Sequence, residues 1–99
     1  MPAYLVITYD VSDPERYADY NPAAVPSIMK TVSKHGGETV FAGPPDVLNG
    51  SVGANTVCVR FPDAEAAKAW LADDEYAPFN AIRMESTTNI VEFIAPGVG

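Results

Sequence analysis

Four apolar, strand-like runs and two helical regions follow one another in a fixed order along this chain. The strand-like runs are rich in β-branched and aromatic residues, which pack well on a pleated sheet, and they cover residues 4–10, 38–42, 56–61 and 88–94. Between the first and second runs, and again between the third and fourth, apolar residues recur every three or four positions, as on one side of a helix. The order is therefore β-α-β-β-α-β.

The first helical region carries its own start and stop signals. Asp13 is followed by Pro14, which predicts an N-cap and a first helical turn in which the missing proline N–H costs nothing. Two internal prolines interrupt the apolar stripe, so we expect a short helix to about Tyr20, a kink, and a second segment that ends near His35. The glycine pair at 36–37 then stops the helix.

The second helical region begins at Asp63, a predicted N-cap, and buries a stripe that includes Ala67 and Trp70. An acidic run and a following proline predict that this region is divided into two helical segments. Residues 43–55 hold glycines, prolines and asparagines, which predict a long hairpin connection. Because 99 residues leave room for one domain only, we expect a single domain over residues 1–99.

This order of elements is the split βαβ pattern of ferredoxin-like folds, an α+β class in which a four-stranded antiparallel sheet carries its helices on one face. Alternation along the strands predicts which residues face the helices, because successive side chains point to opposite faces. Odd-numbered positions are uniformly apolar, so we expect them on the helix side. They are Leu5, Ile7, Tyr9, Val57, Val59, Phe61, Val91 and Phe93.

The even-numbered positions predict a second, mixed face that is too apolar to remain in water. Since both helical regions are used on the other face, the simplest cover is a second copy of the same sheet. We therefore expect a homodimer through the sheet face, with a partly polar interior. The even-numbered residues are Tyr4, Val6, Thr8, Asp10, Thr56, Cys58, Arg60, Ile90, Glu92 and Ile94.

Charge and composition exclude several classes of protein. Six Lys and Arg against thirteen Asp and Glu give a net charge of −7, and the basic residues are scattered, which argues against nucleic-acid and membrane partners. The single cysteine, Cys58, cannot form an internal disulfide, and no clustered ligands or Gly-rich phosphate loop occur, so we expect no metal and no cofactor. No basic leader and no run of ~18 apolar residues is present, so we expect a cytoplasmic protein.

Several short motifs, taken in this order, resemble a single family. They read MPAY at 1–4, DPERY at 13–17, KHGGE at 34–38, RFPD at 60–63, EAAKAW at 65–70 and DEY at 74–76. From Met1 to about Ile94 the chain is similar to the domain of unknown function 1330 family of the dimeric α/β barrel superfamily. The resemblance implies a ferredoxin-like protomer whose sheet pairs with that of a second protomer. It implies no activity, since the superfamily includes cofactor-independent monooxygenases, lactone isomerases, haem enzymes and plain ligand binders.

Arg60 is the first candidate for a functional side chain, because it lies mid-strand on the predicted interior face, where a guanidinium needs an acceptor. It either clamps a carboxylate or enolate oxygen of a small substrate or forms an ion pair with Glu92 or Asp10 on the same face. If Arg60 points elsewhere, Glu92 could act as a general base with a raised pKa.

Histidine, cysteine and aromatic residues offer further alternatives. His35 at a helix C-terminus has a structural reading, since the helix dipole favours its charged form, whereas haem ligation or proton transfer needs it to reach the sheet interior. Cys58 is either a nucleophile or, without a histidine partner, a small packing residue. Five aromatic residues form either a pocket or core packing. They are Tyr4, Tyr9, Tyr17, Tyr20 and Trp70.

Three functions stay open at this point. The first is a homodimer that binds a small apolar or aromatic carboxylate-like ligand between its sheet and helices, with Tyr4, Thr8, Arg60 and Glu92 as the ligand-binding residues. The second is a cofactor-independent, monooxygenase- or isomerase-like enzyme in which Glu92 or His35 moves a proton. The third is an assembly module without a ligand.

Overall fold

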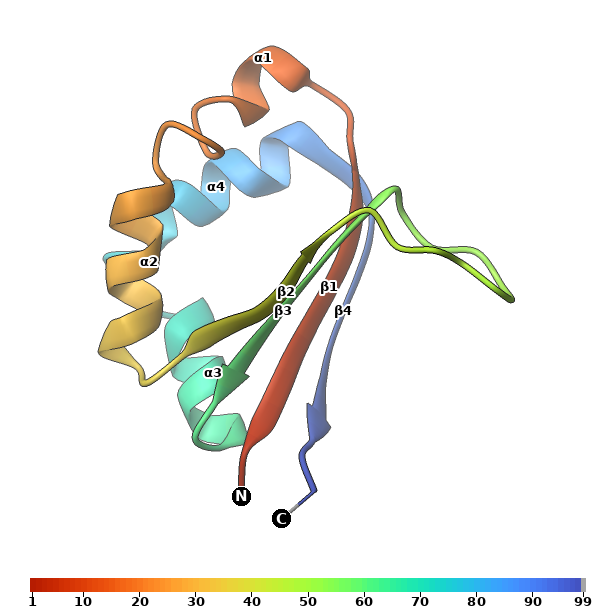
Figure 1. Ribbon diagram of the computed structural model, residues 1–99. Coiled ribbons are helices and arrows are strands. Elements are labelled where there is room, and N and C mark those ends of the chain that lie inside the picture. The colour runs from red at the N-terminus through yellow and green to blue at the C-terminus, as the bar shows by residue number, and fades with distance from the viewer. Residues whose placement is uncertain (99) are drawn as a thin grey trace.

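The strand-like runs form one four-stranded antiparallel sheet, and every helix lies on the same face of it (Figure 1). The computed structural model describes residues 1–98. The strands, in the order β2-β3-β1-β4, are β2 (Glu38–Gly43), β3 (Asn55–Phe61), β1 (Ala3–Val11) and β4 (Thr87–Pro96). The helices are α1 (Pro14–Tyr17), α2 (Val25–Lys34), α3 (Ala64–Leu71) and α4 (Ala77–Ser86). This is the α+β, ferredoxin-like fold that the order of elements predicts.

The first helix starts as predicted but ends earlier. The Asp13 carboxylate accepts a hydrogen bond from the backbone N–H of Arg16 at 3.2 Å, which is the predicted N-cap. However, α1 ends at Tyr17 rather than near Tyr20. The physical reason is Pro22, which has no N–H to continue the helical ladder, so residues 18–24 form turns instead.

The remaining helix boundaries follow the predicted chemistry. Pro26 lies in the first turn of α2, where no N–H is needed, and Gly36 with φ of 74° ends that helix. Asp63 accepts from the backbone N–H of Ala66 at 2.7 Å and caps α3. The predicted division of the second helical region is confirmed as α3 and α4. Within residues 1–98, none of the helices combines the length and apolar character needed to cross a membrane.

The prediction of faces is confirmed for β1 and β3 but wrong for β4. Leu5 lies opposite Ile94 and Ile7 lies opposite Glu92, and residues directly opposite each other share a face, so the even positions of β4 face the helices. Phe93 is 49% exposed on the other face, whereas Ile94 packs against the core. Alternation could not decide this, because β4 carries apolar residues at both parities.

A buried apolar cluster fills the space between the sheet and the helices. At its centre Trp70 stacks on Tyr76, with ring centroids 4.1 Å apart, and the Trp70 indole N–H donates to the Thr31 hydroxyl at 2.9 Å. A buried indole thus has the polar partner it requires. The cluster comprises Leu5, Ile7, Ile28, Val32, Val59, Phe61, Ala67, Trp70 and Tyr76.

The opposite side of the sheet, here called the outer face, carries apolar side chains that nothing in the described chain covers. Phe41 on β2, together with Val91 and Phe93 on β4, are half-exposed, while Cys58 between them is buried by its neighbours. An exposed patch of this kind marks an interaction surface more often than an ordinary solvated one.

The connection between β2 and β3, residues 44–54, is here called the β2–β3 arm. It points away from the helices, on the side of the outer face (Figure 1). At its base Gly53 lies directly against the backbone of Tyr9, with no room for a Cβ, and the Ala54 N–H donates to Asp10 at 2.8 Å. The Asn89 amide donates to the same carboxylate at 3.1 Å. The arm is therefore fixed at its base to β1 and β4.

Gly37 offers a test of how closely the turn after α2 packs on the sheet. A Cβ at this position would lie 2.7 Å from side-chain carbons of both Phe61 and Val32, which are buried and have little room to move. We expect Gly37→Ala to lower the free energy of unfolding by about 1–3 kcal/mol, measured by urea denaturation. Ser33→Ala, at an exposed position of α2, should change it by less than ~0.5 kcal/mol. Equal stability of the two variants would contradict the close packing.

Candidate functional site

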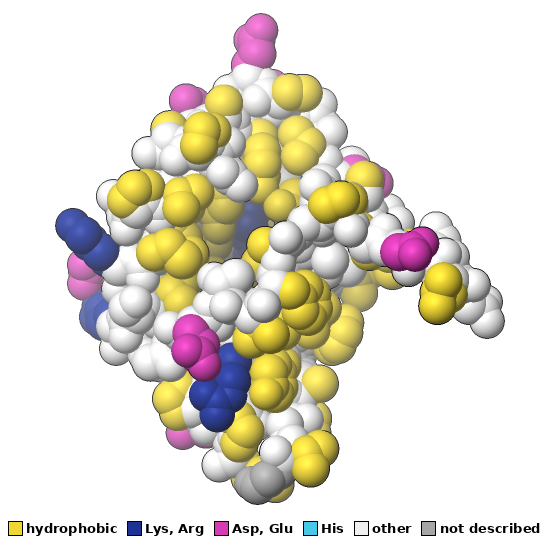
Figure 2. Space-filling view, in the orientation of Figure 1, with side chains coloured by type: hydrophobic (Ala, Val, Ile, Leu, Met, Phe, Trp, Pro, Cys, Tyr) yellow, Lys and Arg dark blue, Asp and Glu magenta, His cyan; other side chains and the backbone are white. Residues whose placement is uncertain are grey.

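A cavity of about 430 Å³ opens between the helix side of the sheet and the first helical region. One wall comes from β1, β2 and β3, the other from residues 17–32, and Trp70 and Arg83 contribute from α3 and α4. Figure 2 shows the hollow, which is framed by hydrophobic side chains and has a basic side chain at its base. The cavity therefore joins an apolar wall to one site of positive charge.

Three tyrosines, Tyr9, Tyr17 and Tyr20, are among the hydroxyl-bearing residues that line the cavity. The Tyr9 and Tyr17 hydroxyls are hydrogen-bonded at 2.6 Å, and those of Tyr20 and Tyr76 at 2.7 Å. Burial first, and then the neighbouring tyrosine, raise the pKa of Tyr9 and of Tyr20 far above the ordinary value. The hydroxyls of Tyr9 and Tyr20 therefore stay neutral near pH 7 and can either donate to or accept from a bound molecule.

Arg83 is the one charged side chain that lines the described cavity, and the residue is only 6% exposed. Its Nη1 donates to Glu92 Oε2 at 3.0 Å, while Nε and Nη2 donate to Asn80 Oδ1 at 3.1 and 2.7 Å. A guanidinium has five N–H groups, and these bonds use three of them. The Tyr76 hydroxyl also interacts with the guanidinium, so at most two N–H groups remain for another oxygen atom.

The charge on Arg83 is maintained in spite of its burial. Burial alone lowers the pKa of the guanidinium, but the interactions with Tyr76 and Glu92 outweigh it and hold the pKa above its ordinary value. Because the surroundings have a low effective dielectric constant, a hydrogen bond from this group to an anionic oxygen is stronger than the same bond in water.

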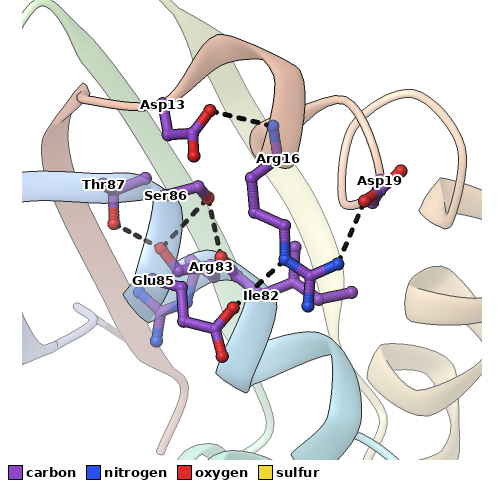
Figure 3. A network of polar contacts seen from close by, with 8 residues as sticks. All are labelled: Asp13, Arg16, Asp19, Ile82, Arg83, Glu85, Ser86 and Thr87. Carbon is purple, nitrogen blue, oxygen red and sulfur yellow. Dashed lines mark hydrogen bonds and ion pairs between the residues drawn. The ribbon is translucent and has the colours of Figure 1, made fainter.

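A polar network at the end of α4 fixes the backbone that carries Arg83 (Figure 3). The hydroxyls of Ser86 and Thr87 donate to carbonyls of the preceding helical turn at 2.7 and 2.6 Å, the second of them the carbonyl of Arg83 itself. From α1, the Arg16 guanidinium pairs with Glu85 at 3.1 Å. The last turn of α4 is thereby held against α1 as well as against β4.

Three residues predicted to bind a ligand between sheet and helices lie on the outer face instead. Tyr4 and Arg60 are opposite each other in the β1–β3 ladder, and Thr8 is opposite Thr56 on the same side. None of the three lines the cavity. Any ligand contact that they make has to occur on the outer face.

The predicted ion pair of Arg60 with Glu92 or Asp10 is wrong. Arg60 is exposed, and its Nη1 lies 3.4 Å from Oε1 of Glu38, the residue opposite it on β2. Glu92 is on the helix side because of the β4 register, and Asp10 accepts from the base of the β2–β3 arm. Since Glu92 pairs with Arg83, it is not a free general base.

His35 lies where the sequence places it, at the C-terminal end of α2, and it does not line the cavity. Its Nε2 is 2.6 Å from Oδ2 of Asp73, and the Lys34 ammonium is 2.8 Å from the same oxygen. This cluster ties α2 to the turn between α3 and α4.

Cys58 is buried on the outer face, and burial raises the pKa of its thiol, which fits a packing role.

Sequence reasoning missed Arg83, although a signal for it was present. Arg83 comes four residues after Phe79 and seven after Tyr76, which places it on the same side of α4 as these two buried or half-buried rings. The alternative of an aromatic pocket has structural support, because Tyr9, Tyr17 and Trp70, together with Tyr20, line the cavity. Tyr4 does not belong to this group.

The fold and the cavity define a class: a small ferredoxin-like α+β protein with an aromatic cavity between its helices and one sheet face. The family model described as "Domain of unknown function (DUF1330)" matches residues 2–97. The chain belongs to this family, which confirms the resemblance seen in its motifs. No curated protein matches the chain.

Solved structures show the same fold at low sequence identity. A protein of unknown function from Rhodopseudomonas palustris has a TM-score of 0.77 at 14% identity, covering 99% of this chain and 83% of that one. SnoaB, a cofactor-independent oxygenase from Streptomyces nogalater, has a TM-score of 0.67 at 11% identity, covering 99% and 94%. A dimeric ferredoxin-like protein of unknown function from Bacteroides fragilis has a TM-score of 0.65 at 11% identity, covering 97% and 96%. At these identities the likeness concerns the fold alone.

The ion-pair cluster at the end of α2 predicts a pH dependence of stability. Lys34 first, then His35 and the backbone N–H of Glu75, hold the pKa of the Asp73 carboxyl well below its usual range. Because an unfolded aspartate titrates near ~3.9, the unfolded state binds more protons below that pH, and the stabilisation is complete above pH ~5 and lost as the pH falls further. Urea midpoints of the wild type and Asp73→Asn should therefore differ at pH 7 and converge toward pH 3.

The matched control is Asp74→Asn, which removes an exposed neighbouring carboxylate that has no ion pair among residues 1–98. Its difference from the wild type should stay small at every pH. A wild-type advantage over Asp73→Asn that is the same at pH 7 and pH 3 would contradict the assigned cause.

Proposed function

We propose that this protein binds a small apolar or aromatic molecule with a carboxylate-like group in the cavity between its sheet and helices. The observation that carries the proposal is a buried guanidinium that lines an aromatic cavity and uses three of its five N–H groups for Glu92 and Asn80. Planar guanidinium groups bind carboxylates through two parallel hydrogen bonds. The role that sequence reasoning gave to Arg60 thus falls to Arg83.

The size and chemistry of the cavity support a ligand of this kind. Small-molecule sites usually measure ~300–1,000 Å³ and combine apolar walls with a few fixed polar groups. At about 430 Å³, this cavity suits a molecule of one or two rings. Tyr9, Tyr17 and Tyr20 would contact the rings and offer neutral hydroxyls, while Arg83 would bind the anionic end.

Catalysis without a cofactor is the second candidate. The observation that favours it is the Arg83 guanidinium, which could stabilise negative charge developing on an enolate or phenolate oxygen. However, the described lining residues include no carboxylate, imidazole or thiol to accept a proton. His35 lies outside the cavity and Glu92 is paired with Arg83, so neither predicted catalyst has a free position facing a ligand. Binding is therefore the better supported of the two functions.

A calorimetric comparison of two arginines tests the proposed site. We expect 1-naphthoate to bind the wild type more tightly than the uncharged 1-naphthamide. The double variant Arg83→Gln/Glu92→Gln, which leaves no buried carboxylate unpaired, should weaken naphthoate binding by ~10–100-fold and abolish the preference. Arg60→Gln, an exposed arginine on the outer face, is the matched control and should change the affinity by less than ~3-fold.

Circular dichroism and urea midpoints establish that each variant is folded before its affinity is compared. Equal naphthoate affinity in the Arg83 double variant and in Arg60→Gln would overturn the proposed site. So would a wild type that neither naphthoate, phenylacetate nor salicylate stabilises in a thermal-shift assay.

We further propose that two copies associate through the outer face. Val91, Phe93 and Phe41 form an uncovered apolar surface, and the Thr8 hydroxyl, in a residue 7% exposed, is the buried polar side-chain atom without a hydrogen-bond partner in residues 1–98. Both features have an explanation if a second sheet lies over this face, because it would remove the apolar groups from water and could supply a partner for Thr8. The dimeric state of the structurally similar Bacteroides protein supports the proposal.

Light scattering after gel filtration tests this association at micromolar concentration. We expect the wild type to have the mass of a dimer and Phe93→Asp that of a monomer, since each copy would place a charge in the apolar interface. Met84→Asp adds the same charge at an exposed apolar residue of α4 and should stay dimeric. A monomeric wild type, or equal masses for the two variants, would contradict the outer-face dimer.

A further inference from the structure

The β2–β3 arm carries an apolar tip that the rest of the described chain, residues 1–98, leaves largely exposed. Leu48 is 92% exposed, and Val47 and Val52 on either side of the tip are also exposed. Figure 2 shows the arm as a projection that stands clear of the body of the molecule. Covering an exposed leucine with another apolar surface lowers the free energy of the protein, because it removes apolar area from water.

The direction and length of the arm indicate which surface that is. The arm leaves the sheet on the side of the outer face, away from the helices and the cavity (Figure 1). It is eleven residues long and doubles back on itself, since Gly43 and Thr56 beside its ends are opposite each other in the ladder, so its tip can reach at most about 16 Å from its base. Two sheets packed face to face are ~10 Å apart, so the tip can extend past the plane of a sheet lying on the outer face.

The area of the outer face also indicates that the arm contacts a second copy of the chain. Four strands of six to ten residues, ~4.8 Å apart, make a flat patch of roughly 500 Å². A stable interface usually buries ~800 Å² of accessible surface on each partner, which is more than this flat patch measures. A second contact region continuous with this face would supply the rest, and in a symmetric pair each copy contributes one arm.

We propose that the β2–β3 arm of each copy embraces the second copy, with Leu48 packed against the partner's surface beside its sheet. This inference rests on the outer-face dimer proposed above and adds the element that holds the two copies together. The base of the arm is held against β1 and β4, because Gly53 lies against the Tyr9 backbone and Asp10 accepts hydrogen bonds from Ala54 and Asn89. Pro44 and Pro45 restrict the strand leaving the sheet, so little conformational freedom is lost on association.

The test compares two adjacent tip residues by sedimentation velocity over a range of protein concentrations. Leu48→Asp removes the apolar contact from both arms and should raise the dimer dissociation constant by at least ~100-fold. Asn49→Asp, the matched control, adds the same charge next to it without removing apolar surface and should raise the constant by less than ~5-fold. Since Leu48 is almost fully exposed, both variants should unfold in urea like the wild type when the comparison is made on monomers.

Each outcome separates the arm from the sheet face. Dissociation of Leu48→Asp with retention of Asn49→Asp supports the proposal. If Leu48→Asp keeps the wild-type dissociation constant while Phe93→Asp dissociates, the arm proposal is overturned and the outer-face dimer stands. If the wild type is monomeric at every concentration, both proposals are overturned.

Discussion

The positive charge buried with Arg83 is the constraint around which the space between sheet and helices is arranged. Removing a guanidinium from water costs several kcal/mol unless it gains partners. Glu92 supplies the opposite charge at 3.0 Å and Asn80 accepts two further hydrogen bonds, so the group is neutralised but not saturated. A pair of this kind is an unusual choice for stability alone, because apolar residues of similar volume often stabilise a core equally well. The N–H groups that Glu92 and Asn80 leave are the ones that the proposed ligand would use.

The sheet has the cavity on its helix side and the β2–β3 arm on its other side. Adjacent residues of β1 contact both of them. Tyr9 points into the cavity, where it is hydrogen-bonded to Tyr17, while Asp10, the next residue, holds the base of the β2–β3 arm. The backbone of Tyr9 itself is in contact with Gly53 of the arm. The cavity wall and the base of the arm are therefore joined through Tyr9 and Asp10, two adjacent residues of β1.

The order of elements and the helix starts could be predicted, because they depend on contacts between residues close in sequence. The site could not, because it depends on how strands far apart in the sequence pair in the sheet. Asp13 and Asp63 cap helices through bonds within three residues, so the sequence alone contains the information. The face of Glu92 depends instead on the pairing of Leu5 with Ile94, which joins opposite ends of the chain. With β4 assigned to the wrong parity, Glu92 was placed beside Arg60. Arg83 then has no visible partner in the sequence, in spite of its helical spacing to two aromatic residues.

The net charge of −7 restricts what the cavity can bind. At physiological ionic strength the field of the surface carboxylates is screened over ~8 Å, so it weakly repels an approaching anion and contributes nothing to its recognition. Two copies would carry −14, which leaves the attraction to local groups. Because Glu92 already balances the charge of Arg83, the guanidinium can offer an anionic group its remaining hydrogen-bond donors and no net charge. A ligand with a single anionic group on an otherwise apolar body fits this balance, whereas a multiply charged anion would meet repulsion outside the cavity and too few donors inside it.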